Sequence, residues 1–167
     1  MSITTFLACY AALLSSIGFG WNLYRDLQNK ARLTVDMRIR RIVQSTDGRW
    51  YQAAPDLPIQ NASEQLFLVA NVANVGHRPV KWVGWGGHYA TPQNGKTGFV
   101  IITRHLPIML PEGESSSEFT DDLGAAGDDV KELFVYDSTG RNWYLSKRGL
   151  KKLKEERRNL MAKQGTK

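Results

Sequence analysis

The chain has 167 residues, of which 42% are hydrophobic and 23% are charged. This length predicts one domain with an appendage, and the composition excludes a wholly disordered chain. Cys9 is the only cysteine, so the chain can form neither an internal disulfide nor a zinc site that takes two of its own cysteines. The net charge is +6, but residues 147–167 hold nine basic and two acidic side chains, which leaves 13 basic against 14 acidic elsewhere. A basic nucleic-acid-binding face over the whole domain is therefore not indicated.

The N-terminal segment, residues 1–24, contains no charged side chain, and its large apolar residues recur at the three-four spacing of a helix. A helix of this length measures about 36 Å, and a bilayer crossing needs roughly 20 mainly apolar residues. We therefore predict a transmembrane anchor over 1–24, continued by a juxtamembrane helix over 25–31. The alternatives are a signal peptide cleaved after Gly20, a lipoprotein modified at Cys9, and a helix buried in a soluble partner. The first lacks a basic start, and the second has too few residues before its cysteine.

The charges that flank this segment predict its orientation. Only the α-amine precedes it, whereas basic side chains follow it at Arg25, Lys30, Arg32, Arg38, Arg40 and Arg41. Because basic flanks stay on the cytoplasmic side, we expect a single-pass inner-membrane protein with its domain in the cytoplasm.

Small residues recur four apart along the predicted span, at Ala8, Ala12, Ser16 and Gly20. Such a stripe lets two helix backbones approach closely in lipid, which predicts pairing with a second copy or with another span. The alternative is chance, because single spans are rich in small residues.

The middle of the chain changes to a period of two. Apolar and polar residues alternate from Leu33 to Arg40, and the alternation breaks at 41–43, which indicates a bulge or the end of the strand. Further strands are expected at 50–51, 66–72, 80–89 (bent at its glycines), 98–103, 115–120 (an edge strand), 130–136 and 141–145, with loops at 53–63 and 107–113. An Asn94-Gly95 turn predicts a hairpin. Seven or eight short strands without a long helix between them predict a mainly β, antiparallel β-sandwich.

Two segments carry a resemblance to a known class of domain. The run from Leu66 to Val80 contains an alternating strand, Asn74-Val75-Gly76 and then Arg78-Pro79-Val80, and it resembles bacterial immunoglobulin-like domains. Leu110-Pro111-Glu112-Gly113-Glu114 is similar to their Pro-Gly-Glu turn. The layout resembles uncharacterised bacterial proteins with one N-terminal span and a small immunoglobulin-like domain. The resemblance implies such a sandwich over 32–146, without the disulfide of antibody domains and without catalytic residues.

Several patterns suggest chemistry, and none makes a complete site. The spacing of His77, His88 and His105 fits no short zinc motif. Gly95-Lys96-Thr97 lacks the first glycine and the following helix of a phosphate-binding loop. The four carboxylates Asp121, Asp122, Asp128 and Asp129 fit helix capping or a solvated loop better than a calcium site. With no activated nucleophile evident, we predict a protein that is not an enzyme and needs no cofactor.

Trp82, Trp85 and Tyr89 lie in the most unusual stretch of the chain. Because Trp82 and Trp85 are three apart, a regular strand would point them to opposite faces, one toward the core and one toward a partner, unless a bulge turns both inward. We name Trp82, Trp85 and Tyr89 as candidate contacts for a protein partner.

The C-terminal residues 147–167 predict a basic amphipathic helix with a narrow apolar stripe. It can lie on anionic lipid, bind nucleic acid, or remain a solvated end. The candidate lipid contacts are Lys147, Arg148, Lys151, Lys152, Lys154, Arg157 and Arg158. The sequence thus favours a membrane-anchored binding or scaffolding module, with a membrane-tethered nucleic-acid-binding protein as the alternative.

Overall fold

The computed structural model describes residues 3–28, 30–45, 47–58, 65–103 and 105–164. The chain is mainly β, with a helix at each end of the described part. Its elements are α1 (Ile3–Gln28), β1 (Leu33–Gln44), β2 (Trp50–Ala53), β3 (Leu66–Asn74), β4 (Val80–Gln93), β5 (Lys96–Ile101), β6 (Ile108–Leu110), β7 (Ser115–Thr120), the 3-10 helix η1 (Leu123–Ala126), β8 (Val130–Asp137), β9 (Asn142–Tyr144) and α2 (Lys147–Gln164).

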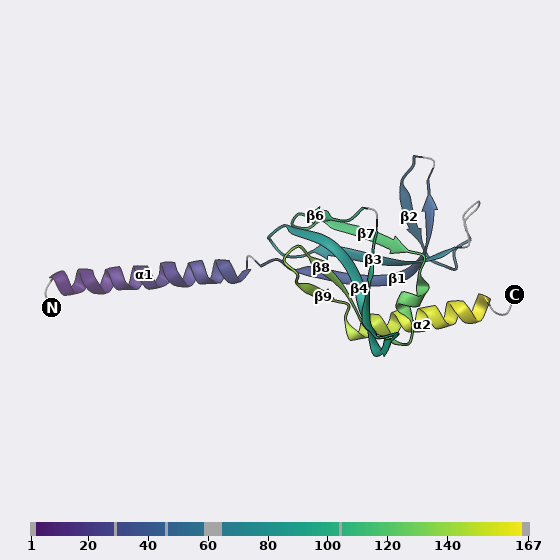
Figure 1. Ribbon diagram of the computed structural model, residues 1–167. Helices are drawn as coiled ribbons and strands as arrows, with labels where there is room; N and C mark the ends of the chain where they lie inside the picture. Colours follow the sequence, from purple (N-terminus) through teal and green to yellow (C-terminus); the bar gives the residue numbers. More distant parts are fainter. Residues whose placement is uncertain (1–2, 29, 46, 59–64, 104, 165–167) are drawn as a thin grey trace.

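The strands form two antiparallel sheets (Figure 1). One has the order β2-β1-β3-β7 and the other the order β5-β4-β8-β9, and β6 pairs with the start of β4. Side chains from both sheets meet in one core, in which Met37 and Leu68 of the first sheet belong to the same cluster as Trp82, Trp85 and Leu133 of the second. Each large apolar side chain buried in this way contributes about 1.5–3 kcal/mol.

α1 extends from one end of the domain as a lone helix (Figure 1). It is long and apolar enough to cross a membrane over Ile3–Arg25, and none of its most apolar window is buried against the described part of the chain. It ends at Gln28, so the juxtamembrane helix predicted for 25–31 is too long, since residues 30–32 are not helical. The domain begins directly after it, because β1 starts at Leu33.

β1 is longer than the alternation predicted. Ile39 and Ile42 are both buried although they lie three apart, so the change of phase is real. The strand nevertheless continues, because it pairs with β3 from Leu33 to Arg41 and with β2 from Arg41 to Gln44. The break in the pattern lies at Arg41, where the pairing of β1 with β3 ends and its pairing with β2 begins.

β4 contains an irregularity that the sequence had left open. Trp82 pairs with Asp137 and Gly84 with Tyr136, so β4 has one extra residue, Val83, between two consecutive positions of β8. This bulge turns both Trp82 and Trp85 into the core, where each is 0% exposed. Glycine is required at Gly84, because a Cβ atom there would overlap the Tyr136 ring.

α2 packs on the domain. Leu153 is 0% exposed in the core cluster, and Leu150 and Leu160 pack against it. Arg40 of β1 donates to Glu156 Oε1 at 2.9 Å, which ties the helix to the first sheet. The interpretation of 147–167 as a solvated end is therefore wrong for the helical residues, because their apolar stripe covers the core.

The other predicted strands and turns are largely confirmed. The hairpin turn consists of Asn94 and Gly95, both with positive φ, but its two strands reach it directly, at Gln93 and Lys96. β8 and β9 form the expected hairpin, and β7 is an edge strand that pairs with β3. β6 was missed, because its three residues lie in a segment that Pro107 and Pro111 mark as a loop.

Candidate functional site

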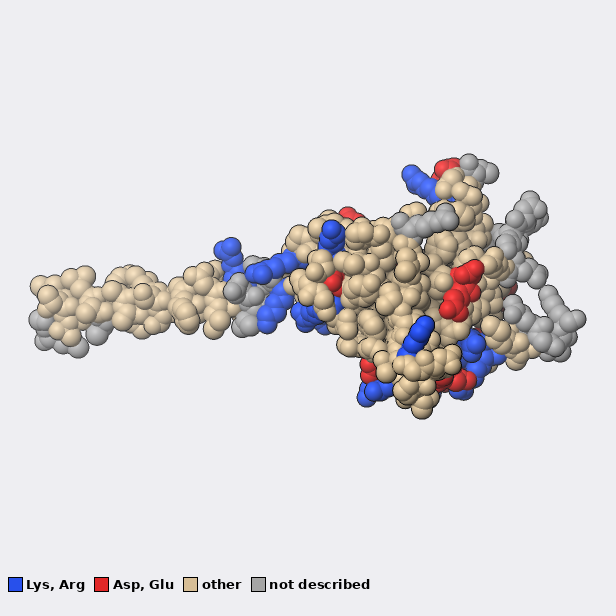
Figure 2. All heavy atoms as spheres, in the orientation of Figure 1, with Lys and Arg blue, Asp and Glu red and all other residues tan. Residues whose placement is uncertain are grey.

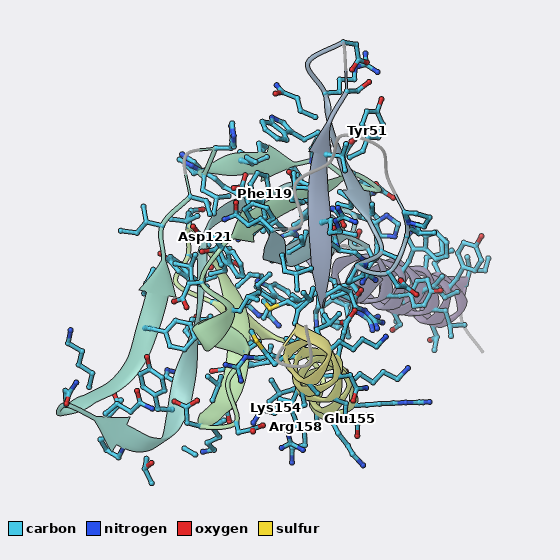
Figure 3. All side chains as sticks on the ribbon, turned by 90° about the vertical axis from the view of Figure 1, so that its right-hand side faces the viewer. Tyr51, Phe119, Asp121, Lys154, Glu155 and Arg158 are labelled. Carbon is cyan, nitrogen blue, oxygen red and sulfur yellow. The ribbon has the colours of Figure 1, made fainter. Side chains whose placement is uncertain are left out.

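Aromatic side chains of β2, β3 and β7 form a cluster on the β2-β1-β3-β7 sheet. Figure 1 shows β2 at the end of the domain away from α1, and Figure 3 labels Phe119 of β7. We define the aromatic cluster as Trp50, Phe67 and Phe119. The Phe67 and Phe119 rings meet edge to face with centroids 5.4 Å apart, and the Trp50 ring lies 6.2 Å from Phe119. Trp50 is 57% exposed, and the neighbouring Tyr51 is also exposed. Large exposed aromatic rings are characteristic of contact surfaces.

A cleft of about 430 Å³ borders this cluster. Phe67, Phe119 and the highly exposed Ile102 form its apolar part, while its polar part comes from Thr103, His105, Glu118, Thr120 and Asp121. Figure 3 shows Phe119 and Asp121 together at the end of β7, well separated from α2. We call this the Glu118 cleft. Its volume is within the usual range of ligand pockets.

Glu118 is the unusual residue of the cleft. Its side chain is only 3% exposed, and within the described part of the chain it forms no ion pair. Burial raises the pKa of Glu118, while the nearby Thr103 hydroxyl and the charge of His105 lower it in part. Thr103 Oγ1 is itself buried and makes no hydrogen bond of acceptable geometry. A strongly buried carboxyl with a raised pKa in a cleft marks a candidate site.

A second cleft, of about 590 Å³, lies between the β4–β5 hairpin, η1 and α2. Tyr89 and Phe99 line it, with their rings 5.2 Å apart. Asp129, which accepts a hydrogen bond from Gln93, and Arg157 are among its polar groups. Arg157 Nε is buried without a hydrogen-bond partner in the described structure.

The structure contradicts the predicted partner contacts at Trp82 and Trp85. Both indoles are fully buried, because the bulge at Val83 turns them to the same side, so neither reaches a partner. Tyr89 is half-buried and lines the second cleft. Trp82 and Trp85 therefore belong to the core, whereas a partner contact at Tyr89 stays a prediction.

Three of the seven predicted lipid contacts on α2 already have other roles. Lys154 donates to the carbonyl oxygens of Asp128 and Val130 at 3.0 and 2.6 Å. Arg158 makes a two-pronged bond to Asp128, which lowers the pKa of that carboxyl. Arg157 is half-buried beside the second cleft. The other four, Lys147, Arg148, Lys151 and Lys152, are exposed, and lipid contact at them stays a prediction.

The remaining candidates take separate places. His77 Nδ1 lies 2.6 Å from Glu112 Oε1, and His88 Nδ1 lies 3.5 Å from Glu132, while His105 borders the Glu118 cleft. Asp122 accepts the Gly124 N–H and caps η1, as the capping interpretation predicted. The stripe Ala8, Ala12, Ser16 and Gly20 is exposed along α1, where pairing stays a prediction.

Sequence reasoning missed Glu118 and the aromatic cluster. Glu118 follows three serines in an edge strand, which is where exposed polar residues are expected. Trp50 and Tyr51 carried a signal, because two adjacent large aromatic residues in a short strand cannot both face the same side.

No protein-family model matches the chain, and a search of curated proteins finds no relative.

Proposed function

We propose that this chain is a membrane-anchored binding protein that is not an enzyme, and that its domain engages a protein partner through the aromatic cluster of Trp50, Phe67 and Phe119. The observation that carries this proposal is that Trp50 is largely exposed while its ring packs beside Phe119 of the same sheet, with the exposed Tyr51 next to it in the chain. Aromatic rings lose little conformational entropy on binding and bury much area, so they dominate interface energies.

The position of the cluster supports the same function. In Figure 1 the β1–β2 ribbon, which carries Trp50, projects at the end of the domain opposite α1. A partner in the aqueous compartment can approach that end without meeting the bilayer. The span then restricts the domain to the membrane, which raises its effective concentration toward other membrane-bound components.

The orientation rests on the charges next to α1. Figure 2 shows basic side chains gathered where α1 meets the domain, and Arg25, Lys30 and Arg32 are exposed there. Basic flanks of this kind favour the cytoplasmic side of the inner membrane. Reporter fusions at the C-terminus test this: activity of a cytoplasmic reporter supports the orientation, and activity of a periplasmic reporter overturns it.

The strand order supports an immunoglobulin-like sandwich. If β1, β3 and β7 correspond to strands A, B and E of that fold, and β4, β8 and β9 to strands C, F and G, both sheets have the immunoglobulin order. The resemblance at Asn74-Val75-Gly76 gains a physical basis, because Asn74 Oδ1 accepts the Gly76 N–H. A Cβ atom at Gly76 would overlap the backbone of Lys30 and Arg32.

Crosslinking and pulldown from membranes test the partner contact. The full chain and a Trp50→Ala/Tyr51→Ala variant are compared, with Tyr144→Ala as control, because Tyr144 is equally exposed on the other sheet. We expect the double variant to lose a specific partner that the wild type and the control retain. If all three recover the same partners, the aromatic cluster is not the contact surface.

A further inference from the structure

The Glu118 cleft contains a buried carboxyl that forms no ion pair within the described part of the chain, beside a buried hydroxyl without a hydrogen bond of acceptable geometry. The carboxyl is that of Glu118, which is only 3% exposed, and the hydroxyl oxygen is Thr103 Oγ1. A buried polar group without a partner costs about 1–3 kcal/mol, and a charged one costs more. Both groups line one cleft that opens to solvent. A buried carboxyl without a counter-ion among the described residues, at an opening to solvent, indicates a place where a ligand supplies the positive charge.

The charges of the cleft restrict what the ligand can be. Glu118 and Asp121 are the acidic groups that line it, and His105 is its titratable basic group in the described structure. An anionic ligand would face both carboxylates. A divalent metal is not favoured either, because the described residues include no group of three His, Cys, Asp or Glu side chains able to hold one. An organic cation can donate hydrogen bonds to Glu118.

The apolar part of the cleft fits the same class of ligand. Phe67 and Phe119 meet edge to face beside Glu118, and ring faces attract ammonium and guanidinium groups. The volume of about 430 Å³ accommodates a long side chain together with its charged end. We propose that the Glu118 cleft binds a primary ammonium or guanidinium group. The bound cation donates hydrogen bonds to the carboxylate of Glu118, and the carboxylate of Asp121 attracts it at the rim of the cleft.

A lysine or arginine side chain of the partner protein is the source that the surroundings favour. Phe67 and Phe119 belong both to the cleft and to the aromatic cluster, so one partner surface covers both. The choice of a partner side chain as the source rests on the proposed function. The binding of a cation by the cleft is independent of that function.

The test uses the full chain in detergent micelles, with butylamine and methylguanidinium as probes and butanol as the uncharged control. Nuclear magnetic resonance follows the Glu118 side-chain carboxyl and the Thr103 amide. We expect a saturable shift of both signals with at least one cationic probe and none with butanol. Glu118→Gln, which keeps the shape of the side chain, should weaken binding about tenfold or more. Glu114→Gln, at an exposed glutamate near the start of β7, should leave binding unchanged.

Two outcomes overturn the proposal. They are the absence of a saturable shift with both probes and equal binding by wild type and Glu118→Gln. Titration with a lysine-containing peptide then separates the sources: binding tighter than butylamine supports a partner side chain, and weaker binding overturns that source. Probe binding without partner capture in the pulldown would leave the cleft standing and remove the proposed function.

Discussion

Two regions of the domain bury polar groups and treat them in opposite ways. Near α1, Asn74 is 0% exposed, and its side chain donates to the carbonyl oxygens of Arg78 and Leu110 and accepts the Gly76 N–H. Asp137, also buried, accepts hydrogen bonds from Thr139, Arg141 and Trp143. Against the effect of burial, these hydrogen bonds lower the pKa of Asp137. In the Glu118 cleft, by contrast, burial outweighs the nearby Thr103 hydroxyl and His105, and the pKa of the carboxyl is raised.

The contrast separates structural from functional polar groups. The buried groups of the first region are hydrogen-bonded because unpaired ones would lower the stability of the fold. A binding site must keep its groups available until the ligand arrives, so it accepts that cost. Substitutions of the buried polar groups near α1 should therefore lower the free energy of unfolding of the protein. Substitution of Glu118 should leave it unchanged or raise it.

The largest effect is expected at Asn74. Asn74→Ala leaves two carbonyl oxygens and one N–H without their partner, so we expect a loss of about 3–4 kcal/mol in the free energy of unfolding. Urea unfolding of the full chain in micelles, followed by near-ultraviolet circular dichroism, measures it. Asn71→Ala is the matched control, because Asn71 lies in the same strand and bonds to Gln52 and Ser117 at the surface. Equal losses in both variants would contradict the structural role of Asn74.

A smaller loss in the free energy of unfolding is expected when Asp137 is replaced. Burial opposes its ionisation, but the hydrogen bonds from Thr139, Trp143 and Arg141 outweigh burial and lower its pKa. Asp137→Asn replaces an acceptor with an amide and should cost about 2 kcal/mol at neutral pH.

The pH dependence tests the same group. Because the folded pKa of Asp137 is lowered, its contribution is present above the unfolded value of about 3.9 and is lost as pH falls through the folded value. Unfolding curves at several acidic pH values should show the wild type and Asp137→Asn converging, relative to an exposed-site control, Asp56→Asn. A gap that widens toward low pH would contradict the lowered pKa.

Glu118→Gln should change stability in the opposite direction, by raising it at pH 7. Because burial raises its pKa, the folded state holds the proton more tightly than the unfolded state. The stability that this group contributes is therefore present below the unfolded pKa and lost as pH rises through the folded pKa. We expect Glu118→Gln to unfold at a higher temperature at pH 7, by an amount equivalent to about 1 kcal/mol, with the gain disappearing toward the ordinary glutamate pKa. A lower unfolding temperature at pH 7 would place Glu118 among the structural polar groups.

Trp50→Ala should change stability least. Trp50 is largely exposed, and surface substitutions usually alter the free energy of unfolding by about 0.5 kcal/mol or less. Thermal unfolding of this variant beside wild type measures the effect. A loss of several kcal/mol would make the aromatic cluster part of the core and not a contact surface.

The sequence predicted those parts of the fold that depend on local pattern. Alternation located β1 and β3, and Asn94-Gly95 located the hairpin between β4 and β5. The places where prediction failed depend on distant partners. Trp82 and Trp85 face the same side because β8 imposes a bulge on β4, and β1 continues past Ile39 because β2 pairs with it. Neither partner strand is visible in the local residues.

The candidate site was less accessible to prediction for the same reason. Glu118 is buried because its edge strand approaches Thr103 and His105, which lie in a segment that no local pattern brings near. The charges of α2 were visible in the sequence, but Lys154 and Arg158 contact Asp128 across a separation of 26 and 30 residues. Charge counting alone could not tell a basic tail from a helix held to its own domain.

The continuity of α1 with β1 has a mechanical consequence. Leu33 follows α1 after a few residues, and β1 is paired with β3 at every position from Leu33 to Arg41. A pull between α1 and the opposite end of the domain acts along this strand, so all hydrogen bonds of the ladder are loaded together and do not break one after another. The fold is thus suited to transmit tension.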